Sequence, residues 1–187
     1  MKKRTIALLC AAIMVVGIAA GGTMAWLVDS TQKEENVFTV GNIDITLEET
    51  TENYKMVPGK DIAKDPKVTL STESENAYVY VEVIESEGLS DYIDYDMNTG
   101  WVELTGEYHA PNGGTIYKYT SEVVKGQPIS VLLGDKVTTL SSVTKEMMTE
   151  AETNQPKLIF YGYAIQTEGF ENAEAAWNAN FQPAVEP

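Results

Sequence analysis

The sequence offers few residues for conventional catalysis. His109 is the only histidine among 187 residues, and no His-Glu-x-x-His run is present, so the usual helical zinc-protease motif cannot be assembled. The single cysteine, Cys10, lies in the leader described below. Serine and threonine are abundant, but no cysteine or suitably partnered histidine completes a nucleophile and base pair. The residue types present therefore argue against a catalytic function for this protein.

One loop carries oxygen side chains at alternate positions. Asp94, Asp96 and Asn98 precede Gly100, a spacing by which calcium loops gather oxygen ligands around a hard cation. The glycine stands one residue later than in an EF-hand, and Glu103 is only the tenth residue of such a loop. We therefore favour a solvated acidic turn, with a weak calcium site at these three residues as the alternative. No other cofactor is indicated.

The elements around this loop are patterned as short strands separated by turn residues. Segment 77–85 alternates valine with tyrosine and glutamate, and segment 157–168 is apolar at both alternating sets of positions, which predicts a central strand covered on both faces. Segment 170–180 predicts a short helix, and 144–153 a single helical turn or a loop. The other predicted strands are 37–47, 67–71, 101–108, 115–122, 128–133 and 136–140.

This pattern predicts an all-β fold. We expect an antiparallel β-sandwich of the jelly-roll or immunoglobulin-like type with one short carboxyl-terminal helix, preceded by an amino-terminal signal helix. The predicted organisation is a signal peptide at 1–25, an arm at 26–36 and a sandwich domain at 37–187.

The amino terminus has the features of an export signal. Three cations at positions 2–4 precede an apolar run at 6–20, and Thr23 and Ala25 supply the small residues at −3 and −1 of a cleavage site. Cleavage there makes Trp26 the first mature residue. An uncleaved membrane anchor is the alternative, because the apolar segment is nearly long enough to span a bilayer.

Segment 26–36, WLVDSTQKEEN, begins apolar and becomes polar and charged. Nothing within it gives it a reason to fold alone, so we expect a free arm. Its leading residues are Trp26, Leu27, Val28, Asp29 and Ser30.

Charge limits the partners of the mature protein. The chain has 28 acidic and 13 basic residues, a formal net charge of −15. Such a surface repels nucleic acid and anionic lipid, whose binding depends on lysine and arginine. We expect a secreted protein at the cell surface or in the matrix, with membrane contact only before cleavage.

The leader and the segment after it resemble the TasA and camelysin family of Gram-positive bacteria, exported through a SipW-type signal peptidase. The resemblance rests on TMAWLVDS followed by NVFTVGNIDITL, with Trp26, Asp29, Ser30, Phe38 and Gly41 at the family's characteristic positions. Later segments, such as AYVYV at 77–81 and YAIQ at 163–166, are similar to the clostridial branch of BsaA-type biofilm matrix proteins.

The resemblance implies a subunit that polymerises into extracellular fibres by donor-strand exchange, the arm of one copy completing the sheet of the next. The implied partners are further copies of the chain, the SipW-type peptidase, and other matrix or cell-surface components. Two alternatives stay open. One is a monomeric extracellular binding module for a surface partner or glycan, and the other is a secreted peptidase of the camelysin type.

Overall fold

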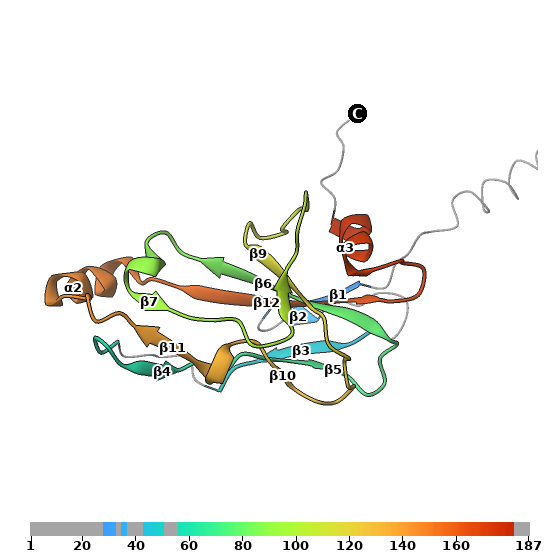
Figure 1. Ribbon diagram of the computed structural model, residues 1–187, viewed down its shortest axis with the longest axis horizontal. Helices are drawn as coiled ribbons and strands as arrows, with labels where there is room; N and C mark the ends of the chain where they lie inside the picture. Colours follow the sequence, from blue (N-terminus) through green and yellow to red (C-terminus); the bar gives the residue numbers. More distant parts are fainter. Residues whose placement is uncertain (1–27, 33–34, 37–42, 51–55, 182–187) are drawn as a thin grey trace, which may run out of the picture.

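Backbone hydrogen bonds arrange the chain as antiparallel β-sheets in two layers. The computed structural model describes residues 28–32, 35–36, 43–50 and 56–181 (Figure 1). The predicted leader, the cleavage position at Trp26, Leu27 and the first part of predicted strand 37–47 lie outside these residues. The all-β sandwich predicted from the sequence is confirmed.

One layer is a single large sheet. Among the described residues it has six strands, in the order β2 (Glu35–Asn36), β1 (Val28–Gln32), β12 (Leu158–Gln166), β6 (Ala77–Glu85), β9 (Thr115–Tyr119) and β8 (Trp101–Glu103). Strands β6 and β12 are its longest members and pair along nine residues, from Leu158 opposite Glu85 to Gln166 opposite Ala77. These two strands form the centre on which the other strands assemble.

The facing layer is split into two small sheets that follow one another along the molecule (Figure 1). The first contains β10 (Ile129–Ser130), β5 (Lys67–Leu70) and β3 (Ile45–Glu48), and the second contains β4 (Asp61–Ala63), β11 (Lys136–Thr139) and β7 (Ile93–Asp94). A short 3₁₀ turn at Leu89–Asp91 leads from β6 into β7, and another at Leu133–Asp135 joins β10 to β11.

The main core lies between the layers. Val79, Val81 and Val83 alternate along β6 and pack against Ile45, Val68, Leu70 and Val137 of the facing strands, all of them buried. Alternate residues of a strand point to opposite faces, so the valines of segment 77–85 meet this core and its tyrosines lie on the other face.

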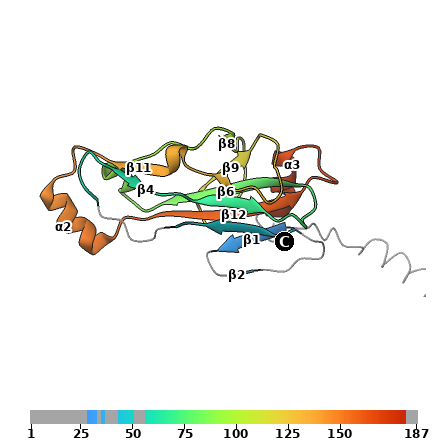
Figure 2. The same ribbon diagram turned by 90° about the horizontal axis from the view of Figure 1, so that it is seen from below.

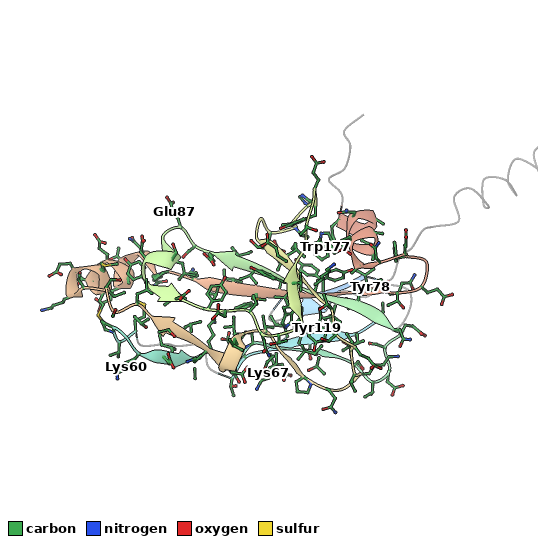
Figure 3. All side chains as sticks on the ribbon, in the orientation of Figure 1. Lys60, Lys67, Tyr78, Glu87, Tyr119 and Trp177 are labelled. Carbon is green, nitrogen blue, oxygen red and sulfur yellow. The ribbon has the colours of Figure 1, made fainter. Side chains whose placement is uncertain are left out.

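Helix α3 (Ala173–Phe181) covers a second, aromatic core on that other face (Figure 1). Trp177 is fully buried there, 4.9 Å from the ring of Tyr80 and 5.2 Å from that of Tyr163, measured between ring centroids. Figure 3 shows Trp177 between the helix and the sheet.

Hydrogen bonds and an ion pair fix the helix in this position. Tyr80 Oη donates to the carbonyl of Ala173 at 2.7 Å, and Trp177 Nε1 donates to the carbonyl of His109 at 2.9 Å. Lys118 Nζ donates to the carboxylate of Glu174, a contact that holds the pKa of that carboxyl below its usual value.

Several predicted boundaries need correction. Segment 144–153, predicted as a single turn or a loop, forms the ten-residue helix α2 (Lys145–Asn154), because Thr144 caps its amino end by accepting from the Met147 amide. Predicted strand 101–108 ends at Glu103, and strands β4 and β7 lie in segments for which no strand was predicted.

Replacing Trp177 with alanine should lower the free energy of unfolding by about 3 to 5 kcal/mol, the usual cost of truncating a buried aromatic residue. Chemical denaturation followed by fluorescence measures the change. Val102→Ala is the matched control, because 47% of Val102 is exposed, and it should change stability by less than about 0.5 kcal/mol. Equal stabilities of the two variants would show that α3 is not anchored through Trp177.

Candidate functional site at the edge of strand β12

Strand β12 needs backbone hydrogen-bond partners along both of its edges. Both of its faces pack against apolar layers, with Phe160, Tyr163, Ala164 and Ile165 buried. One edge is fully paired with β6. Its amides and carbonyls on the other edge need further partners, because a long apolar edge strand is a template for pairing.

The amino-terminal arm supplies part of that pairing. Strand β1 runs antiparallel to β12 with Val28 opposite Ile165 and Thr31 opposite Gly162. Predicted arm residues Val28, Asp29 and Ser30 are therefore strand residues, and the expectation of a free arm was wrong for them. The distant edge of β12 provides the longer of the pairings that make this segment a strand.

The arm is a hairpin that covers only part of β12. After Gln32 the chain turns back into β2, with Thr31 opposite Asn36 and Gln32 opposite Glu35. Figure 2 shows β1 directed along β12 toward α2 before this reversal. Within the described part of the chain, no strand pairs with residues 158–161 on the arm's side of β12.

A cavity of about 680 Å³ lies beside this uncovered segment. Leu158, Ile159, Phe160 and Tyr161 all line it, as do Leu47, Ile62 and Val137 of the facing strands. Neighbouring residues of a strand point to opposite faces, so a cavity that touches all four β12 residues runs along the edge of the strand. The uncovered edge and the cavity therefore form one groove.

One ion pair lies in this largely apolar groove. Lys64 Nζ donates to Glu49 Oε1 at 2.8 Å and stands 5.4 Å from the centroid of the Phe160 ring. The Lys64 side chain is only 9% exposed. Its aliphatic stem can pack on the apolar wall while the ammonium is neutralised by Glu49.

A buried carboxylate that the sequence pattern did not reveal holds the neighbouring loop. Glu82 is fully buried and accepts from the amide nitrogens of Asn112 and Gly114 and from Asn112 Nδ2, each at 2.9 Å, and from Tyr163 Oη at 2.7 Å. Burial, together with the bond to Glu82, raises the pKa of the Tyr163 phenol. The available signal in the sequence was Glu82 itself, an acid between the two apolar residues Val81 and Val83 of a predicted strand.

The three residues of the predicted calcium site are only partly brought together. Asp94 and Asp96 line a cavity of about 360 Å³ with Glu85 and Tyr95. Asn98 instead donates from Nδ2 to the Ser130 carbonyl at 3.3 Å and accepts from the Thr99 amide at 2.8 Å. The calcium site stays a prediction.

The geometry as a whole defines a class of protein, a β-sandwich whose principal sheet is extended at one edge by the amino-terminal strand of its own chain. A comparison with known protein families shows what part of the chain is similar to. Residues 1–82, fewer than half of the chain, match the family model described as camelysin metallo-endopeptidase, so this part of the chain is similar to that family. No curated protein and no solved structure matches the chain. Among the described helices none is long and apolar enough to cross a membrane.

The family description implies a metal, but the donor set does not fit one. His109 lies exposed in a loop, and over the part of the chain that the structure describes no three His, Cys, Asp or Glu residues are grouped to hold a metal ion. No metal-dependent step is therefore derived for this chain.

Calcium titration tests the loop at Asp94. Because Asn98 is engaged by the backbone, we expect no heat above dilution in isothermal calorimetry with the intact protein or with the Asp94→Ala, Asp96→Ala double variant. Saturable heat in the intact protein that the double variant lacks would establish the site.

Glu82→Gln should destabilise the protein by about 1 to 3 kcal/mol, because the amide nitrogen of glutamine would face donors that the carboxylate now accepts. Glu103→Gln, on an exposed residue of β8, is the control and should be nearly neutral. Denaturant unfolding compares them, and equal midpoints would contradict a stabilising role for the Glu82 network.

Proposed function

We propose that the protein is a secreted structural subunit of extracellular matrix fibres, joined when the arm of one copy pairs with β12 of the next. The observation that carries this proposal is the position of the arm. The segment that the sequence marks as separate from the sandwich is the segment that extends its principal sheet.

Topology makes the arm suitable for exchange. β1 joins the sheet at its edge, and among the described strands β2 pairs only with β1, so the arm can leave without separating any other described pair of strands. Four residue pairs hold β1 against β12, compared with nine between β12 and β6. The arm therefore has fewer than half as many pairs with β12 as β6 has.

The same edge can accept the arm of another copy. The backbone bonds are the same whichever copy supplies them, which is why exchange of an identical element is a low-cost route to assembly. If each copy donates one arm and accepts one, the contact is head-to-tail. Such a contact extends into an open filament unless its rotation closes a ring.

Processing would prepare the arm for this role. Cleavage after Ala25, which we assign to a SipW-type signal peptidase, leaves Trp26 only two residues before β1. The arm then has a free end that can reach a neighbouring copy, whereas the uncleaved leader would keep it at the membrane. Secretion and cell-surface location agree with the camelysin family model that residues 1–82 match.

A second candidate is a monomeric module that binds a glycan. Tyr78 and Tyr119 line a cavity of about 320 Å³ together with Asn76 and Thr167, at the end of the sandwich where Figure 3 labels both tyrosines. Aromatic faces beside amide and hydroxyl groups are suited to sugars. This function would not require the arm.

Removal of residues 26–36 separates the candidates. Electron microscopy should show fibres for the intact exported protein and none for the shortened one. A finer pair of variants is Thr31→Pro and Thr31→Ala, at the residue opposite Gly162 of β12. Proline removes a backbone donor within β1 and should reduce fibre formation, whereas alanine keeps that donor and should not. Equal fibres from the shortened and intact proteins would overturn donor-strand assembly.

A further inference from the structure

The loop before β9 places an asparagine directly before a glycine at an exposed turn. Ala110 O accepts from the Gly113 amide at 3.1 Å, so Pro111 and Asn112 are the central residues of a β-turn. Asn112 is exposed, and a Cβ added at Gly113 would meet nothing within 4 Å. Because glycine has no side chain to shield its backbone nitrogen, this nitrogen can attack the asparagine carboxamide. The turn therefore carries the residues for spontaneous deamidation.

The folded loop holds both of the groups that would react. Asn112 Nδ2 donates to Glu82 Oε2 and to Tyr163 Oη, each at 2.9 Å, which uses both hydrogens of the carboxamide. The Gly113 amide is engaged by Ala110 O in the turn. A further bond from the Gly114 amide to Glu82 Oε1, at 2.9 Å, fixes the end of the loop. Attack thus requires the loop to open first.

We propose that Asn112 is a deamidation site that the Glu82 network gates, and that its modification prevents the loop from closing again. The closed loop protects the carboxamide, and each opening exposes it to Gly113. The modification is irreversible, so modified chains accumulate with time. The site lies apart from the arm, and the inference does not depend on the proposed function.

The reaction needs only water as a co-reactant. The Gly113 nitrogen bonds to Asn112 Cγ, the bond from Cγ to Nδ2 breaks, and ammonia leaves with the proton of the Gly113 amide. Water then opens the resulting succinimide ring at either carbonyl, which gives aspartate or isoaspartate. One water is consumed, one ammonia is released, and nothing is oxidised or reduced.

The product cannot restore the network. Aspartate at 112 would place a second carboxylate against Glu82, which is fully buried, and like charges at this distance oppose each other. Two donors are lost at the same time, and the single proton of Tyr163 Oη already goes to Glu82, at 2.7 Å. Isoaspartate also lengthens the backbone, which shifts the Gly114 amide away from its acceptor. An unpaired buried carboxylate is costly, so the open loop is favoured.

Loss of the loop also weakens the attachment of α3. The His109 carbonyl accepts from Trp177 Nε1 at 2.9 Å, and Tyr108 and Ala110 pack against the aromatic core. The loop lies close on β6, since a Cβ added at Gly114 would stand 2.5 Å from a backbone oxygen of that strand. An open loop withdraws these contacts together, so modified chains have a less firmly held helix.

Peptide mapping by mass spectrometry tests the site and its gate. Protein incubated in mildly alkaline buffer should gain one mass unit at Asn112. Tyr163→Phe should raise this rate several-fold, because it removes the hydroxyl that accepts from Asn112 and donates to Glu82. Tyr95→Phe is the matched control, since its hydroxyl bonds Glu85 away from the loop, and it should leave the rate unchanged.

Unfolding the protein in denaturant gives the rate without a gate. We expect the fastest conversion of Asn112 there. Equal rates in the folded and unfolded protein would overturn the gate. If Asn112 in the unfolded chain converts no faster than Asn98, which precedes a threonine, glycine confers no reactivity and the site itself is overturned.

Hydrogen exchange on Asn112→Asp tests whether the product keeps the loop open, and it leaves Tyr163 in place. Peptides containing residues 112–114 should lose protection in this variant. Asn154→Asp, which adds the same charge at an exposed residue of α2, should keep that protection. Unchanged protection in Asn112→Asp would overturn the proposal, because the network would then accept aspartate.

Discussion

The unpaired backbone edge of β12 is the constraint on which the rest of the structure depends. This nine-residue strand is buried on both faces from Gly162 to Ile165, where amides and carbonyls without partners would cost free energy. One edge is satisfied by β6 and half of the other by β1. The remaining half opens onto the largest of the cavities described above, so the same requirement explains both the fold of the arm and the groove.

The two cores explain why the groove lies where it does. The inner core runs the length of the sandwich, but the aromatic core under α3 covers the other face of the central sheet only around Tyr80, Tyr163 and Trp177. The Glu82 network fixes the adjoining loop to the same region through Tyr163. The α3 end of β12 is thereby held rigid, and the end near Leu158 is left accessible.

Alternating patterns made the central strands predictable. Segment 77–85 was predicted with the boundaries that β6 has, and 157–168 was correctly predicted to be covered on both faces. The pairing of Val28–Gln32 could not be predicted, because a polar segment acquires strand structure only from a distant edge. Glu82 was missed for a similar reason, since its donors come from a loop about thirty residues away. Local sequence patterns predict which segments form strands and helices, whereas pairing between distant segments decides where those strands lie in the fold.

The most direct test of arm exchange is a cryo-electron-microscopy structure of the assembled fibre. The account predicts density for β1 (Val28–Gln32) of one subunit paired antiparallel with β12 of the next, with Val28 opposite Ile165. A fibre in which every arm stays folded back on its own β12, with subunits joined through other surfaces, would contradict the account.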